Sequence, residues 1–160
     1  MKLNKALIAA RSVEEMVQLV REAGDDGLNA VNAATALHQL AKRSAKAKHT
    51  VKKEDVELIN KHVGRTLEGF KARELANTVW AWAKLGAHPG EELLRSVGRA
   101  VERKLGDFNP QAIANTVWAW ATLGAHPGEE LMRSVGRAVE RKLGDFNPQD
   151  IANTVWACRY

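Results

Sequence analysis

The chain contains one 38-residue unit written twice in succession, and this duplication restricts its possible folds more than any other feature. Residues 77–114 and 115–152 differ at three positions only, which are Lys84/Thr122, Leu94/Met132 and Ala112/Asp150. A third copy opens at Asn153 and reaches Tyr160. A fixed period of this length is typical of a solenoid, in which each unit buries its apolar face against its neighbours. Solenoids commonly present binding surfaces, so the period favours recognition over catalysis.

Each unit is predicted to be a helical hairpin. Asn109-Pro110 forms a helix start, because Asn caps free N–H groups and Pro at the first helical position has no N–H to lose. The first helix then runs to Gly124, a residue suited to a left-handed helix end. A second helix is expected to open at His126-Pro127 and to continue through Leu143. No segment alternates as a strand would, so the chain is predicted to be all-α.

The fold class is therefore an α-solenoid, a right-handed superhelix of antiparallel helical hairpins with about three and a half repeats. One domain is expected over residues 1–160. Its parts are degenerate N-terminal repeats at 1–65 with an exposed basic loop at 42–53, regular repeats at 66–103 and 104–141, and a truncated repeat at 142–160.

The two helices of a unit carry different patterns. The second is apolar on one side only, as expected for an outer helix. The first is apolar around most of its circumference, so it is expected to lie between neighbours and to line the concave side. It keeps one narrow polar stripe, which reads Arg73, Asn77 and Lys84 beside Trp80, then Gln111, Asn115 and Thr122 beside Trp118, then Gln149, Asn153 and Tyr160 beside Trp156.

The stretch FNPQxIANTVWAWAxLG at Phe108–Gly124, inside a 38-residue hairpin, resembles the octotricopeptide-type repeat of organellar RNA-binding proteins. It is also similar to the RNA-editing substrate-binding complex family and to FAST-kinase-like RNA regulators. The resemblance covers most of residues 12–160. It implies binding of organellar transcripts, with roles in their processing, editing, stability or translation.

Combined with that resemblance, the stripe suggests a way of reading RNA. Helical-repeat RNA binders read one base per repeat through two or three side chains. Asn115 and its equivalents Asn77 and Asn153 lie in mid-helix, where Asn is intrinsically disfavoured, and an amide can donate to and accept from a base edge. The alternative is a hydrogen bond from Asn115 to the neighbouring hairpin's loop. For Trp80 and Trp118, base stacking competes with packing between repeats, which we favour.

Positive charge gathers in the expected basic loop. The chain has a formal net charge of +5, and six basic residues lie within twelve positions: Lys42, Arg43, Lys46, Lys48, Lys52 and Lys53. Such a patch binds polyanions through counterion release. The alternative is an ordinary solvated loop.

Several classes of function are not supported by the sequence. The single cysteine, Cys158, excludes a disulfide framework and a cysteine-based zinc site. No apolar run approaches the length of a membrane span. His88 and His126 precede Pro-Gly-Glu-Glu turns, where helix capping explains the composition, and no catalytic motif is present. We expect no enzyme activity, no cofactor, no metal site and no membrane contact.

Two functions remain as expectations. The first is single-stranded RNA binding in organellar RNA metabolism, and the alternative is a protein-interaction scaffold without nucleic acid. Expected partners are RNA, other proteins of an RNA-processing complex, and a chain that pairs through the uncapped C-terminal end. The expected location is the mitochondrion or chloroplast, with the cytoplasm as the alternative.

Overall fold

The computed structural model describes residues 2–47 and 51–159, and the regular structure it assigns there is helical. The α-helices are α1 (Lys2–Ala9), α2 (Val13–Gly27), α3 (Ala30–Ala47), α4 (Lys53–Thr66), α5 (Ala72–Leu85), α6 (Glu91–Lys104), α7 (Pro110–Leu123), α8 (Glu129–Lys142) and α9 (Pro148–Ala157). Short 3-10 turns follow the second helices as η1 (Leu67–Gly69), η2 (Leu105–Asp107) and η3 (Leu143–Asp145). The predicted all-α class is confirmed.

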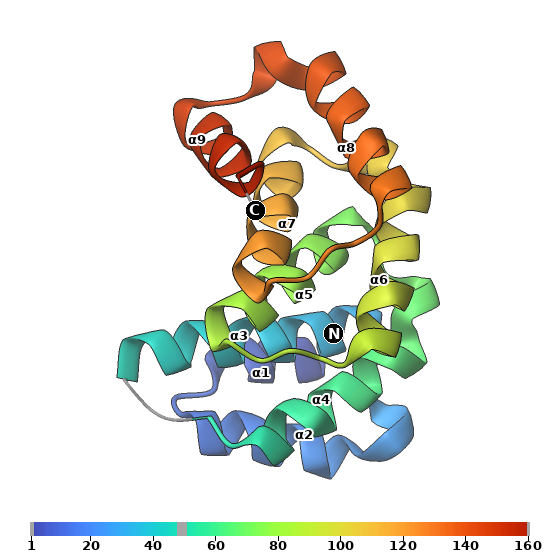
Figure 1. Ribbon diagram of the computed structural model, residues 1–160. Helices are drawn as coiled ribbons and strands as arrows, with labels where there is room; N and C mark the ends of the chain where they lie inside the picture. The colour runs from blue at the N-terminus through green and yellow to red at the C-terminus, as the bar shows by residue number, and fades with distance from the viewer. Residues whose placement is uncertain (1, 48–50, 160) are drawn as a thin grey trace.

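The helices stack as hairpins in chain order, from α1 and α2 at one end to α8 and α9 at the other (Figure 1). The odd-numbered helices α1, α3, α5, α7 and α9 pack directly on one another, and we call them the first-helix layer. The even-numbered helices α2, α4, α6 and α8 form the second-helix layer. Because each hairpin contacts mainly the hairpins before and after it, the arrangement is that of an α-solenoid.

The core runs between the two layers and repeats with the sequence. Trp82 and Trp120 are 0% and 2% exposed, and Phe70 and Phe108 are fully buried. The Trp82 indole Nε1 donates to Asn60 Oδ1 of α4 at 2.8 Å. These aromatic side chains fill the space where a first helix meets the preceding second helix, so each unit completes its core only with its neighbour.

A lysine at the end of α6 and another at the end of α8 bind the unit before each helix. The Lys142 ammonium donates to the carbonyl oxygens of Gly106, which lies in η2, and of Phe108, which directly follows η2. Lys104, one repeat earlier, does the same to the carbonyls of Phe70 and Glu68. These carbonyls follow the end of a helix and would otherwise lack partners.

The helix ends agree in part with the sequence. The Asn109 side chain accepts from the Ala112 N–H at 2.7 Å, and Gly124 ends α7 with φ 62°. The second helix begins later than predicted, at Glu129 and not at His126-Pro127. Gly128 stands before it with φ 101°, a conformation in which His126 Nδ1 accepts the Gly128 N–H at 3.2 Å. The His-Pro-Gly segment is therefore a turn.

The expected basic loop at 42–53 was largely wrong. Helix α3 continues to Ala47, and Lys53 is already the first residue of α4. Lys, Arg and Ala are good helix formers, so a cation-rich segment continues a helix readily when its charges face solvent. Lys48, the side chain of Lys46 and Tyr160 lie outside the described residues.

The N-terminal segment is a helix of the stack. Leu7 is fully buried, and α1 packs on α3. The Arg43 guanidinium donates to the carbonyl oxygens of Ile8 and Ala10, both within 2.9 Å, and to Gln39 Oε1 at 2.6 Å. Arg43 thus satisfies the open end of α1 and is committed to the fold.

Apolar side chains are exposed at the α9 end of the stack. Ile151 and Val155 are 42% and 57% exposed, whereas Ile113 and Val117, which precede them by one repeat, are 1% and 5% exposed. The difference arises because the next unit covers Ile113 and Val117. Position in the stack, and not side-chain type, therefore sets the burial of these residues.

Candidate functional site

A groove runs over the first-helix layer, across α1, α3, α5 and α7, with a volume of about 820 Å³. It brings together five of the residues predicted to bind RNA: Lys42, Arg73, Asn77, Gln111 and Asn115. The groove also contains polar side chains that the sequence reasoning missed: Asn4, Thr35, His38, Gln39 and Asn109. Lys42, Arg73 and Gln111 are exposed, and Asn77 and Asn115 are half-buried.

The repeat register explains why these side chains meet. Thr35, Arg73 and Gln111 are spaced by one 38-residue period, and so are Gln39, Asn77 and Asn115. Because successive first helices pack directly on each other, equivalent positions line up across the layer. Lys42 is the equivalent of Trp80, so it belongs to this stripe and not to a loop.

The Asn77 and Asn115 amides form no hydrogen bond to any other residue that the structure describes. The bond from Asn115 to a neighbouring hairpin's loop is therefore not observed within these residues. Half-buried amides at the floor of a groove keep their donors and acceptors for a ligand. In α9, by contrast, Asn153 Oδ1 accepts from Gln149 Nε2 at 3.0 Å.

The groove is polar and mostly cationic. Lys42 and Arg73 carry positive charge, and Glu74 is the acidic lining residue, whose carboxylate accepts the Lys71 N–H at 3.1 Å. Burial lowers the pKa of His38, and the nearby charges of Lys42 and Arg73 lower it further. His38 is therefore neutral near pH 7, so the lysine and the arginine supply the attraction for an anion.

Apolar side chains form one wall of the groove. Ile8 is 52% exposed and Val31 is 46% exposed, although both are large aliphatic residues. A ligand with a flat or apolar part as well as a charged part would use both chemistries. Nucleotides have this combination, because the base offers an apolar face and the phosphate a charge.

An aromatic row continues the stripe beyond the groove. The Lys84 Nζ lies 5.7 Å from the Trp80 ring centroid and 4.9 Å from that of Trp118. The His38 ring packs against the Trp80 ring, with their centroids 5.0 Å apart and an interplanar angle of 58°. Both tryptophans are half-buried. They pack between repeats, as favoured from the sequence, and also take part in the polar stripe.

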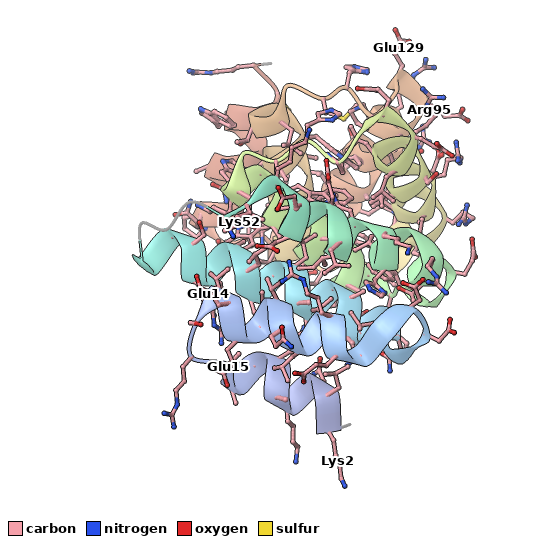
Figure 2. All side chains as sticks on the ribbon, turned by 90° about the horizontal axis from the view of Figure 1, so that it is seen from below. Lys2, Glu14, Glu15, Lys52, Arg95 and Glu129 are labelled. Carbon is pink, nitrogen blue, oxygen red and sulfur yellow. The ribbon has the colours of Figure 1, made fainter. Side chains whose placement is uncertain are left out.

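Other predicted site residues lie away from the groove. Thr122 is exposed near the end of α7, and Gln149 and Asn153 lie on α9. Of the cations once assigned to a loop, Lys53 pairs with Glu57 at 3.5 Å, and Lys52 is exposed just before α4. Figure 2 shows Lys52 well separated from Arg95 and Glu129, which point outward from the second-helix layer. Of the described cations in this range, Lys42 lines the groove, Arg43 binds the end of α1, and Lys53 pairs with Glu57.

No three side chains of His, Cys, Asp or Glu within 2–47 and 51–159 gather into a site that could hold a metal ion. No helix in those ranges has the length and apolar character required to cross a membrane.

A family model, the N-terminal domain of the Tbc2 translation factor, matches residues 9–159 of the chain. The chain belongs to the Tbc2 translation factor N-terminal domain family. This overturns the octotricopeptide-type resemblance and those to the RNA-editing and FAST-kinase-like families. Membership of the Tbc2 family associates the chain with translation and RNA-related function. No curated protein matches the chain significantly.

Proposed function

We propose that the groove of the first-helix layer binds single-stranded RNA and that this binding is the chain's contribution to translation. The observation that carries the proposal is the convergence of Lys42 and Arg73 with the Asn77 and Asn115 amides in one groove. The translation-factor family supports an RNA ligand over other polyanions.

The two kinds of side chain have different tasks in this proposal. Lys42 and Arg73 attract phosphates, with counterion release as the driving force. Asn77 and Asn115 hydrogen-bond to base edges, which are accessible only when bases are unpaired. The strand would cross the first helices in order, because the groove runs across α3, α5 and α7. The chain is proposed to act by binding, without catalysis.

Fluorescence anisotropy with a labelled single-stranded RNA tests the proposal. Arg73→Ala should weaken binding to all sequences alike and lower the slope of log affinity against log salt by about 0.7. Asn77→Ala and Asn115→Ala should each weaken binding about fivefold, as expected for one hydrogen bond of about 1 kcal/mol, and leave that slope unchanged.

The matched control is Arg95→Ala on α6, which removes the same charge from the second-helix layer (Figure 2). It should leave affinity nearly unchanged. Equal losses from Arg73→Ala and Arg95→Ala would show that net charge, and not the groove, determines binding. Absence of binding to any single-stranded RNA at low salt would refute the proposal.

A protein contact at the α9 end is a second candidate function. It is favoured by the exposure of Leu143, Ile151, Val155 and Trp156 at one end of the stack. Equilibrium sedimentation of the chain and of Val155→Glu tests it for self-association. An identical monomeric mass for both would exclude pairing between two copies of the chain through this end.

Location in a mitochondrion or chloroplast remains a proposal. Imaging of the fluorescently tagged protein in its own cells tests it, and a diffuse cytoplasmic signal would contradict it.

A further inference from the structure

Trp80, Lys84 and Trp118 form a compact cluster on the polar stripe, which we call the tryptophan–lysine cluster. Trp80 and Lys84 come from α5, and Trp118 comes from α7. The Lys84 ammonium lies within cation–π range of both rings, 5.7 Å from the Trp80 centroid and 4.9 Å from the Trp118 centroid. Lys84 itself is exposed, and both rings are half-buried. The cluster therefore has a movable part held over two fixed aromatic surfaces.

Building on the RNA binding proposed above, we propose that the tryptophan–lysine cluster is a base-stacking site in which Lys84 is a displaceable occupant. In the free protein the Lys84 ammonium covers the ring faces. When a single strand binds, a nucleobase takes the place of the ammonium over one of the tryptophans. Lys84 then swings outward and pairs with a phosphate of the same strand.

The exchange is favourable on general grounds. Stacking of a base on an aromatic side chain is stronger than a cation–π contact at an exposed site. The lysine does not lose its interaction, because it exchanges two rings for a phosphate. Its flexible stem and exposed position allow that movement without a change in α5.

The surroundings of the cluster favour a nucleic acid as the occupant. The His38 ring packs against Trp80 and also lines the groove. A strand that lies in the groove would therefore reach the cluster next. Along that path the groove carries the positive charges of Lys42 and Arg73 and the one negative charge of Glu74 among its described lining residues.

The chain contains its own comparison for this site. Position 84 is one of only three at which the two units differ, and Thr122 occupies the equivalent place beside Trp118 and Trp156. A threonine has neither a charge nor the reach to cover a ring. The lysine over the tryptophan rings is thus present only in the first of the two units. Replacing Lys84 by Thr removes it, and replacing Thr122 by Lys adds one to the second unit.

The first experiment measures affinity for a short single-stranded oligoadenylate over a series of salt concentrations. Lys84→Thr, which copies the second unit, should lower the slope of log affinity against log salt by about 0.7, since one phosphate contact to a single strand is lost. Across a fourfold rise in salt the wild-type chain should lose about two- to threefold more affinity than Lys84→Thr. Thr122→Lys should raise the slope by about 0.7, and Arg95→Thr should leave it unchanged.

The second experiment follows tryptophan emission during the same titration. Trp82 and Trp120 are buried and should emit unchanged, whereas stacking should quench Trp80 or Trp118. The double variant Trp80→Phe, Trp118→Phe should lose the quenching. Lys84→Thr should keep it, because the rings remain.

The outcomes separate the two proposals. If RNA binds, but Lys84→Thr leaves the salt slope unchanged and no emission is quenched, the stacking site is wrong and RNA binding by the groove stands. If quenching persists in Trp80→Phe, Trp118→Phe, the base stacks elsewhere and the site is also wrong. If no single-stranded RNA binds to any variant, both proposals fail.

Discussion

The indole nitrogens of Trp82 and Trp120 have different environments although the two units are almost identical. Trp82 Nε1 donates to Asn60 Oδ1 on the preceding second helix. Trp120 Nε1 is buried without a partner in the described residues, because Gly98 stands one repeat after Asn60. A buried N–H without an acceptor lowers stability by about 1–3 kcal/mol. The difference comes from the older unit that precedes the duplication.

Gly98→Asn should therefore stabilise the protein. The new amide can accept the Trp120 N–H as Asn60 accepts that of Trp82, and replacing a mid-helix glycine adds a further gain. A Cβ on Gly98 would lie 3.7 Å from Leu131 Cδ2, an ordinary contact. We expect the free energy of unfolding to rise by about 1–2 kcal/mol in urea denaturation.

The reverse substitution is the matched control. Asn60→Gly removes the acceptor from Trp82 and places a glycine inside α4. It should lower the free energy of unfolding by about 2 kcal/mol. If Gly98→Asn does not raise the free energy of unfolding, the unpaired indole N–H of Trp120 does not limit the stability of the protein.

His62 should make stability depend on pH. It is 1% exposed, and its Nδ1 has no partner among the described residues. Burial lowers its pKa; the charge of Asp25 opposes this, and Arg65 and Lys61 reinforce it. The unfolded chain therefore takes up a proton near pH 6.5 while the folded chain does not. Stability should be full above that pH and fall as the pH drops toward the lowered folded value.

Thermal unfolding between pH 7.5 and 5 measures this effect. His62→Ala copies Ala100 and Ala138 of the later units and should flatten the pH profile. Part of the slope should remain, because the pKa of His38 is lowered in the same direction. An unchanged slope in His62→Ala would contradict the assignment.

Among the elements, α6 and α8 contact the preceding unit through their last lysines, Lys104 and Lys142. Lys104→Met should remove the donors to the Phe70 and Glu68 carbonyls while keeping the apolar stem. We expect the free energy of unfolding to fall by about 1 kcal/mol, measured in urea. The same loss is expected for Lys142→Met, which breaks the bonds to Gly106 and Phe108.

Lys53→Met provides the control for these two variants. Its side chain is 89% exposed, and its ion pair with Glu57 is an i,i+4 surface pair. Such pairs contribute little to stability. A loss for Lys53→Met as large as for Lys104→Met would mean that general charge removal, and not the carbonyl contacts, is responsible.

Helix boundaries were predictable where local chemistry fixes them. Asn109, Pro110 and Gly124 act within one turn of their own helix, and the structure confirms them. The extension of α3 was not predictable, because it depends on Arg43 reaching carbonyls of α1 more than thirty residues away. A run of cations is read as a solvated loop when the sequence does not reveal the distant groups that these cations bind.

The groove was predictable in the regular units and not in the older one. Arg73, Asn77 and Asn115 follow from the repeat, and the structure brings them together. Thr35, His38 and Gln39 were missed because the polar stripe was traced only through the regular and last units, and not into the diverged first helix before them. Shifting Arg73 and Asn77 back by one period would have identified Thr35 and Gln39.

At the scale of the whole molecule, stability should be graded along the stack. Helix α5 packs between α3 and α7, whereas α9 exposes Ile151 and Val155. In a solenoid each unit is stabilised by its neighbours, so the end units open more easily. Hydrogen exchange should be slowest in α5 and faster in α9. Equal protection of both helices would indicate a single cooperative unit.

The family resemblance drawn from the short motif failed for a physical reason. Phe108, Ile113, Val117 and Trp120 of that motif are buried. They are the residues that any stack of such hairpins requires, and they carry little information about ligand or lineage. The match over residues 9–159 uses the diverged first half of the chain as well.

The contact of Lys142 has a consequence for evolution. The ammonium donor lies in one copy of the repeat and its carbonyl acceptors lie in the copy before it, so the junction between two copies is encoded within the repeated segment itself. An additional copy inserted in frame would bring its own lysine–carbonyl contact and its own part of the ligand-facing surface. The chain can therefore lengthen by whole units while the existing contacts between units stay the same.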